Sequence, residues 1–343
     1  MASSGPADGE GARPDSLRHW VRSGRTLVDP AHAGVRLDLY LARRFTYRSR
    51  TQWRRIVREG RLTVNGAAAR PARMLRAGDR IDYVPRRRAE PPVDRRYLLL
   101  HADEDLVAVA KGGNLPIHPS GRYFHHTLLH LLLEDHPEWR RLHVIHRLDR
   151  ETSGVVVFGR TRAAAGRVAR QFRERTIEKR YLALVAGSPP AQRFTIDLPL
   201  GPARDSLIRK AVGVRPDGLP ARTAVRVLHR GAGWAWVEAR PLTGRLHQIR
   251  VHLKAVGLPI AGDKVYGADE RFFLKFVAGD PLTLEEQARL GHARQALHAW
   301  RLRLRHPRTG VSLVLTAPLP DDLRDALAAR GFDPDGALPP EAD

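Results

Sequence analysis

Apolar residues recur at helical spacing in two short segments near the start of the chain. Residues 37–41 predict one helix, because their apolar side chains would share one face. Residues 53–57 predict a second helix, which would begin after Ser49, a residue type that caps helix N-termini, and end at Gly60. The spacing therefore predicts two short helices in succession.

A hairpin pattern follows these two helices. Residues 62–64 alternate between apolar and polar side chains, and the Asn-Gly pair directly after them is a signal for a hairpin turn. A Gly-Asp turn then leads into another strand at residues 80–84. Together, these elements predict a small α+β domain within residues 17–85.

The longer remainder of the chain mixes strands and helices without a regular order. Four strands are predicted, at residues 97–101, 106–110, 155–158 and 181–185. Helices are predicted at residues 161–175 and 247–256, the second of them ending at Gly257. There is no regular strand–helix repeat and no glycine-rich phosphate loop, which argues against a doubly wound nucleotide-binding fold. The pattern predicts an α+β domain at residues 97–320, built on a mixed, mostly antiparallel sheet.

The segments around these two domains are expected to be less ordered. Residues 1–16 are rich in small and polar side chains and predict a disordered tail. The arginine- and proline-bearing residues 86–96 suit a flexible linker. Residues 321–343 are acidic and contain Pro and Gly, so we expect a peripheral tail there.

The charge of the chain points to a polyanionic partner. Its 343 residues include 59 Lys and Arg against 37 Asp and Glu, for a formal net charge of +22. Arginine use in a GC-rich genome is an alternative source of this excess, but the basic residues are clustered, which favours nucleic acid. The clusters are Arg48, Arg50, Arg54, Arg55 and Arg58 in the first domain, and Arg162, Arg167, Arg170, Arg173 and Arg175 in the second.

Cysteine is absent, which excludes disulfides, thiolate catalysis and cysteine-ligated metals. No segment approaches the ~20 apolar residues of a membrane span, and the N-terminus lacks the order of a secretory signal. We therefore expect a cytoplasmic protein with no membrane partner.

One carboxylate has the sequence surroundings of a reactive group. Asp149 lies between Arg147 and Arg150 on a turn that leads into an apolar strand. Neighbouring positive charge favours the ionised form of a carboxylate, which suits a nucleophile better than a proton donor. Taken alone, the same pattern is also typical of a structural ion pair.

Four ordered blocks resemble RluA-type RNA pseudouridine synthases. They are His146-Arg147-Leu148-Asp149 with Thr152-Ser153-Gly154, residues 178–187, residues 242–252 with 259–267, and residues 296–300 before His306-Pro307. The first domain resembles the S4-like RNA-binding domain. This resemblance implies a pseudouridine synthase fold that isomerises uridine in structured RNA.

The resemblance also implies roles for particular residues. Asp149 would be the catalytic carboxylate, Arg250 its ion-pair partner, and Tyr181 the ring that stacks on the target base. Arg147 would help to fill the stack that the flipped base leaves. His146 is expected to fix the Asp149 loop by hydrogen bonding. Substrate and RNA contacts are expected from Arg147, His146, Thr152, Arg245, His247, Gln248, Arg50 and Arg54.

The chemistry implied by the resemblance requires no cofactor. His126 and His130 have the spacing of two metal ligands on a helix, but no third ligand is suggested, so no metal site is predicted. Large-subunit ribosomal RNA is the favoured substrate, transfer RNA is the alternative, and we expect a monomer without a protein partner. Two other hypotheses are a non-catalytic RNA-binding or ribosome-assembly factor, and an N-glycosidase that pairs Asp149 with Glu151.

Overall fold

The computed structural model describes residues 24–45, 49–83, 90–121, 123–208, 210–334 and 338. Contacts divide the chain into two compact units, Met1–Ala89 and Glu90–Asp343. The tail predicted at residues 1–16 lies outside the described residues, as does Arg48 of the predicted basic face. Among the described helices, none is long and apolar enough to cross a membrane.

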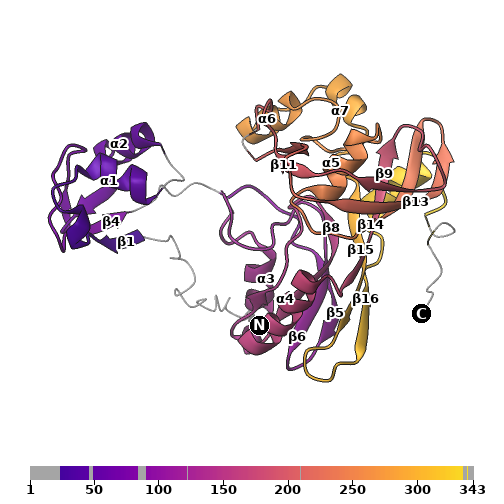
Figure 1. Ribbon diagram of the computed structural model, residues 1–343, viewed down its shortest axis with the longest axis horizontal. Coiled ribbons are helices and arrows are strands. Elements are labelled where there is room, and N and C mark those ends of the chain that lie inside the picture. Colours follow the sequence, from indigo (N-terminus) through magenta and orange to yellow (C-terminus); the bar gives the residue numbers. More distant parts are fainter. Residues whose placement is uncertain are drawn as a thin grey trace, which may run out of the picture. The chain divides into compact units, whose positions relative to one another are not determined.

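The first unit has two helices and a four-stranded antiparallel sheet of order β1-β4-β2-β3 (Figure 1). Ser49 caps α2 as predicted, because its hydroxyl accepts from the Gln52 amide while the Gln52 side chain accepts from the Ser49 amide. Trp53 and Tyr40, one from each helix, lie in the core of this unit. Its elements are β1 (Gly24–Leu27), η2 (Pro30–His32), α1 (Leu37–Arg44), α2 (Arg50–Arg58), β2 (Leu62–Val64), β3 (Ala67–Ala68) and β4 (Arg80–Tyr83).

The second unit is built on a ten-stranded sheet. Its strands β5, β6, β8, β9, β13, β14, β15 and β16 are labelled in Figure 1. Its main path runs β10-β13-β14-β9-β15-β8-β6-β5, with β16 paired to β15 and β7 to β8. The strands are β5 (Tyr97–Ala102), β6 (Leu106–Lys111), β7 (His143–Val144), β8 (Ser153–Gly159), β9 (Glu178–Ala186), β10 (Arg193–Asp197), β13 (Arg222–Gly231), β14 (Trp234–Pro241), β15 (Leu297–Arg305) and β16 (Ser312–Thr316). A separate small pair joins β11 (Leu200–Pro202) to β12 (Val212–Val214). The predicted α+β class with a mostly antiparallel sheet is confirmed.

Helices cover the sheet and connect its strands. They are α3 (Leu128–Asp135), η3 (Pro137–Trp139), α4 (Arg162–Glu174), α5 (Gln248–Ala255), α6 (Arg271–Ala278), α7 (Leu284–Leu290) and α8 (Asp321–Ala328). Every residue of β8 is buried, because Val156 packs in one cluster with Leu131 of α3 and Val157 packs in another with Val168 of α4. Strand β8 is therefore held from both faces directly after the Asp149 turn.

The only parallel pairing among the described strands joins β8 to β15. It aligns Ser153 with His298 and Gly154 with Ala299. Gly154 has a φ of +115°, and a Cβ at this position would lie 2.2 Å from the Ala299 carbonyl oxygen. A side chain is therefore excluded where the chain leaves the Asp149 turn and enters the sheet.

The expectation of a peripheral C-terminal tail is wrong for much of residues 321–343. Helix α8 lies there, and Leu323 and Leu327 are fully buried in the same cluster as Trp236 of β14. Phe332 stacks on His229 with ring centroids 4.7 Å apart. The apolar spacing of this segment is helical, and burial of that face outweighs its acidic composition.

The expectation of a flexible linker is also wrong for its second half. Residues 84–89 lie outside the described part of the chain, but Glu90 is anchored. Its carboxylate accepts hydrogen bonds of 2.8 Å from the backbone amides of Phe124, His125 and His126. Burial alone would raise the pKa of Glu90, but these hydrogen bonds lower it below its ordinary value. The first residue of the second unit is therefore held in place by hydrogen bonds to the backbone of residues 124–126.

Candidate active site

Asp149 lies on the turn between β7 and β8, at the wall of a cavity of about 430 Å³. Tyr181 from β9 and Arg250 from α5 line the same cavity, as do Arg147 and His247. The Asp149 side chain is 24% exposed, so a ligand in the cavity can reach its carboxylate. The fold therefore brings together three residues that are separated by more than 30 positions in sequence.

The ion pair expected between Arg250 and Asp149 is present. Arg250 Nη1 donates to Asp149 Oδ2 at 2.7 Å. From the other side, Asp263 accepts from Arg250 Nε at 2.7 Å and from Nη2 at 2.8 Å. Arg250 is only 6% exposed, and its guanidinium also lies 4.8 Å from the centroid of the Tyr266 ring. The bidentate pair with Asp263 fixes the guanidinium, which leaves Nη1 directed at Asp149.

The charge of Asp149 depends on this arrangement. Burial on its own would raise the pKa of Asp149, but the charge of Arg250 and hydrogen bonds from Arg250 and Gln295 lower it below the ordinary value of 3.8. Conversely, burial would lower the pKa of Arg250, and the nearby carboxylates of Asp263 and Asp149 raise it. Both groups are therefore ionised at neutral pH.

The sequence argument that Arg147 and Arg150 hold the charge of Asp149 is wrong. Of the described arginines, only Arg250 lies within ion-pair distance of this carboxylate. The Arg150 guanidinium turns away and lies 4.6 Å from the centroid of the Phe276 ring, while its Nη2 donates to Glu151 Oε1 at 3.1 Å. The Arg147 side chain stays exposed at the cavity. The ion-pair partner of Asp149 is therefore distant in sequence rather than adjacent to it.

Tyr181 presents an uncharged phenol to the cavity. Burial and the negative charge of Asp149 both raise the pKa of Tyr181 above its ordinary value. The hydroxyl therefore keeps its proton at neutral pH. A neutral aromatic ring beside the carboxylate is a suitable surface on which a planar base can stack.

His247 lies between Asp149 and Tyr266 at the N-cap of α5. Its Nε2 is 3.6 Å from Asp149 Oδ1, and its Nδ1 is 2.7 Å from the Tyr266 hydroxyl. Burial lowers the pKa of His247 more than the Asp149 carboxylate raises it, so the ring is neutral at neutral pH. A hydrogen bond from the Tyr266 hydroxyl to Nδ1 favours the tautomer whose Nε2–H faces Asp149.

Some residues expected to contact RNA have structural roles instead. Gln248 is 4% exposed, and its amide makes four hydrogen bonds within the protein, which use its full capacity. Thr152 is 2% exposed and accepts from the Gln295 side chain. His146 accepts from the Val157 amide at 3.0 Å, so it holds the Asp149 loop against β8, as expected. Burial lowers the pKa of His146 to about 4.

Arg245 has a less restricted position. It lines the cavity, and its Nε donates to the Pro220 carbonyl at 3.1 Å, which leaves the terminal nitrogens of the guanidinium available. Together with Arg147, it places positive charge at the edge of the cavity. An RNA contact by these two arginines remains a prediction.

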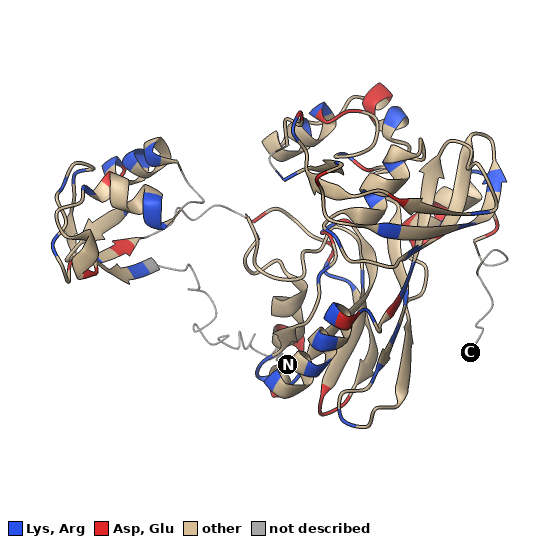
Figure 2. Cartoon of the chain, in the orientation of Figure 1, with Lys and Arg blue, Asp and Glu red and all other residues tan. Residues whose placement is uncertain are grey.

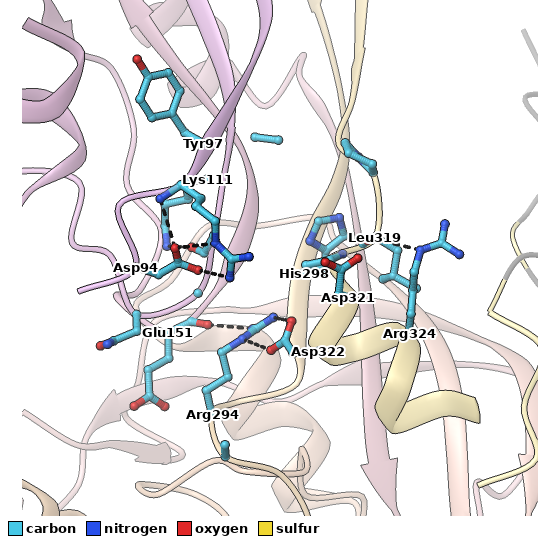
Figure 3. A pocket seen from close by; sticks show the side chains of 18 of the residues that line it. Asp94, Tyr97, Lys111, Glu151, Arg294, His298, Leu319, Asp321, Asp322 and Arg324 are labelled. Atoms are coloured by element: carbon cyan, nitrogen blue, oxygen red, sulfur yellow. Dashed lines mark hydrogen bonds and ion pairs between the residues drawn. The ribbon is translucent and has the colours of Figure 1, made fainter. Parts of the chain in front are cut away.

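A larger cavity of about 750 Å³ is lined by Glu151, two residues after Asp149, as well as by Arg294 and Asp322 (Figure 3). Glu151 lines this cavity and pairs with Lys264 at 3.2 Å. Arg294 donates to the Glu151 carbonyl at 2.9 Å, and its Nε lies 2.6 Å from the Asp322 carboxylate of α8, as Figure 3 shows. Through Arg294, helix α8 therefore stabilises the turn that carries Asp149 and Glu151. The side chains of Asp149 and Glu151 line different cavities.

Two arginines of the predicted basic face, Arg50 and Arg54, lie with Arg36 around a buried carboxylate. Asp38 is 0% exposed, and Arg36, Arg50 and Arg54 approach it at 3.2, 3.0 and 3.9 Å while their own side chains are 42%, 48% and 45% exposed. Burial would raise the pKa of Asp38, but Arg36 and Arg50 lower it. The contact with Asp38 thus holds Arg50 and Arg54 in place. The remaining guanidinium nitrogens of both residues are exposed to solvent.

Sequence reasoning missed two residues of the site. Asp263 fixes Arg250, and Gln295 reaches both Asp149 and Thr152. Asp263 stands in the Gly-Asp-Lys-Val-Tyr-Gly segment that carried part of the resemblance, and Gln295 directly precedes the last block. That placement was the available signal, but nothing in the sequence indicated which side chain each one contacts.

Comparison with known proteins agrees with this architecture. Residues 105–255 match the family described as RNA pseudouridylate synthase, and residues 35–81 match the S4 domain. The chain is 35% identical to ribosomal large subunit pseudouridine synthase D of Nitrosomonas europaea, over 93% of this chain and 92% of that protein. The enzyme of the same name from Pseudomonas aeruginosa is 35% identical over 84% and 90% of the two chains.

A solved structure is similar as well. Human RNA pseudouridylate synthase domain containing 4 superposes with a TM-score of 0.53 and 29% identity, covering 67% of this chain and 92% of that one. Sequence and fold lead to one assignment: the chain belongs to the RluA-type family of RNA pseudouridine synthases and carries an S4 domain before its catalytic domain.

Proposed function

We propose that Asp149 is the catalytic carboxylate for conversion of uridine to pseudouridine in structured RNA. The observation that carries this proposal is an ionised, accessible carboxylate that a fixed, buried guanidinium holds beside a neutral tyrosine. Isomerisation breaks the bond from the ribose anomeric carbon to the base nitrogen, turns the base, and joins the ribose to carbon five. Asp149 either attacks the anomeric carbon or acts as the base that gives a glycal.

The cavity dimensions support base flipping. A uridine paired or stacked in folded RNA cannot reach a carboxylate at the wall of a 430 Å³ cavity, so the nucleotide has to leave its stack. In the cavity, the base would stack on Tyr181, and the phenol is a candidate to assist proton transfer at carbon five. Arg147, exposed at the cavity, is the candidate to fill the vacated stack.

Large-subunit ribosomal RNA is the proposed substrate. The relatives from Nitrosomonas europaea and Pseudomonas aeruginosa are named for the ribosomal large subunit, and they align over most of this chain. The S4 domain would add affinity through Arg50 and Arg54, whose exposed nitrogens can reach phosphates. Transfer RNA remains the alternative substrate.

The geometry disfavours an N-glycosidase that uses Asp149 with Glu151. Paired carboxylates have to flank one bond, but Glu151 lines the other cavity and is taken up by Lys264 and Arg150. Hydrolysis would also release free base. Isomerisation retains it.

Tritium release tests the proposal. The wild-type protein is incubated with large-subunit ribosomal RNA transcripts that carry tritium at carbon five of uridine. We expect release of tritium without free uracil, because carbon five exchanges its hydrogen for the bond to ribose. Release from transfer RNA alone would change the substrate, free uracil would indicate glycosidase activity, and the absence of release from any cellular RNA would contradict the proposal.

A further inference from the structure

The face of the sheet opposite the Asp149 cavity carries a row of arginines. Side chains alternate along a strand, and in β9 Lys179 and Tyr181 line the cavity, so Glu178 and Arg180 point away from it. In β13, Thr223 hydrogen-bonds to Gln248 on the cavity side. The residues adjacent to Lys179 and Tyr181 in β9, and those adjacent to Thr223 in β13, therefore lie on the opposite face of the sheet.

The strand register extends this face over five strands. Arg193 of β10 aligns with Arg226 of β13, and Arg226 aligns with Glu238 of β14. Arg180 of β9 aligns with Arg301 of β15. We call this surface the arginine face; it consists of Arg180, Arg193, Arg222, Arg226, Arg240, Arg301 and Arg303, with Glu178, Asp197 and Glu238. Seven arginines against three carboxylates leave four positive charges.

The carboxylates of this face are occupied by three of its arginines. Glu238 accepts from Arg240 Nε at 2.7 Å and lies 3.7 Å from Arg180. Glu178 binds Arg180 at 2.7 Å, and Asp197 lies 3.8 Å from Arg222. These pairs hold the arginines in place but account for only part of the positive charge.

Four arginines of the face have no carboxylate within ion-pair distance among the described residues, although the charge of Arg303 contributes to lowering the pKa of Glu178. Arg193 is exposed, and Arg226 and Arg303 are partly exposed. Arg301 is 9% exposed, and its Nη1 is buried without any hydrogen-bond partner. A cavity of about 320 Å³ lies beside Arg193 and Arg226 on this face.

We infer that the arginine face binds the phosphate backbone of RNA, apart from the nucleotides that enter the Asp149 cavity. Neighbouring strands are about 4.8 Å apart, so five strands extend over ~19 Å, or about five steps along a nucleic-acid strand. Planar guanidiniums bind phosphate oxygens with two parallel hydrogen bonds. Figure 2 shows basic positions on strands of the large sheet as well as on its helices.

Helix α8 limits the extent of this surface. Leu323 and Leu327 pack with Trp236, the alternate neighbour of Glu238 in β14, so α8 covers the adjoining part of the same face. The arginine face is the part of this sheet face that α8 does not cover. The inference rests on the proposed function only in taking RNA as the ligand, and the two can fail separately.

The salt dependence of RNA binding tests the inference. The full chain with Arg193→Gln, Arg226→Gln and Arg303→Gln is titrated with a large-subunit ribosomal RNA fragment at 50 to 400 mM KCl. Each lost phosphate contact lowers the slope of log Kd against log salt by about 0.7 to 0.9, so we expect a decrease of about 2 to 3 from the wild-type value. Thermal unfolding checks that the variant is folded.

A charge-matched triple variant is the control. Arg204, Arg271 and Arg308 are exposed but already paired with carboxylates, and their replacement by Gln removes the same charge. We expect the slope of this control to change by less than about 1. A folded arginine-face variant whose slope equals that of the wild type or of the control overturns the inference. Failure of the proposed function would appear separately, as absence of tritium release by the wild type.

Discussion

Two carboxylates of this protein are held by arginines in opposite ways. In the catalytic unit the arginine is buried and the carboxylate can be reached, because Arg250 has a side-chain exposure of 7% against 24% for Asp149. In the S4 unit the carboxylate is buried and the arginines can be reached, because Asp38 is 0% exposed and Arg50 is 48% exposed. In each pair the accessible partner is the one for which we propose a function.

The physical cost of each arrangement is met by additional partners. A buried guanidinium with a single carboxylate partner would lack hydrogen-bond acceptors. Asp263 provides them, because it accepts two hydrogen bonds from Arg250 on the side away from Asp149. A buried carboxylate needs several donors, and Arg36 and Arg50 both donate to Asp38. In each unit, the additional partners of the buried group therefore leave the other group of the ion pair accessible to solvent.

Removal of Arg250 from the catalytic unit should have the largest effect on stability. Arg250→Gln leaves Asp149 and Asp263 without their cation, and we expect a loss of about 3 to 5 kcal/mol in the free energy of unfolding. The lowered pKa values of both carboxylates contribute stability that is present above their ordinary value of 3.8 and is lost as pH falls through the folded-state values. Urea unfolding of wild type and variant between pH 3 and 7 measures this. Equal stability at pH 7 would contradict the prediction.

Asp263→Asn should lower stability less than Arg250→Gln does, because the amide keeps part of the hydrogen bonding, and it should also slow catalysis. The amide keeps the shape but weakens the hold on Arg250, and a displaced Nη1 should lower kcat by about 10- to 100-fold. Loss of the Asp263 charge alone would lower the pKa of Asp149, whereas displacement of Nη1 would raise it, so movement of the acid limb of the pH–rate profile toward neutral pH would report that displacement. Tritium release at saturating RNA between pH 4.5 and 8 is the measurement. A fall in kcat at all pH values without movement of the acid limb would exclude an effect through Asp149.

Glu90→Gln should have the smallest effect of the three. Glu90 holds the backbone at residues 124–126, and the adjacent Tyr123 hydroxyl accepts from Arg150, the residue after Asp149. Loss of charge on this acceptor should cost about 1 to 2 kcal/mol of stability and reduce kcat by a few-fold. Glu134→Gln is the matched control, because the ion-pair partner of Glu134 among the described residues is the exposed Arg95. Equal stability and equal kcat of the two variants would contradict a role of Glu90 in supporting the site.

Local structure could be predicted well where caps and periodicity agree. The helix predicted at 161–175 appears as Arg162–Glu174, with the Thr161 hydroxyl bonded to the Ala164 amide. The helix predicted at 247–256 appears as Gln248–Ala255. Both are set by interactions within a few residues, which a sequence displays directly.

The contacts that the sequence did not reveal are long-range ones. Asp149 and Arg250 are 101 positions apart and were joined only through the resemblance, whereas Glu151 with Lys264 and Arg294 with Asp322 were not expected. Helix α8 was missed because acidic composition was weighed above its apolar spacing. Such contacts depend on the order of strands in the sheet, which periodicity does not encode.

A parallel kinetic comparison of Asp149→Asn and Asp38→Asn tests the central contrast most directly. Tritium release from the ribosomal RNA substrate gives kcat and KM for both variants. We predict that Asp149→Asn lowers kcat by at least about 10³-fold with KM within a few-fold of wild type, because an amide cannot act as nucleophile or base. Asp38→Asn should raise KM about five-fold or more with kcat nearly unchanged, because it would release the arginines for which we propose RNA binding. Substantial kcat in Asp149→Asn, or the same parameter changed in both variants, would contradict the account.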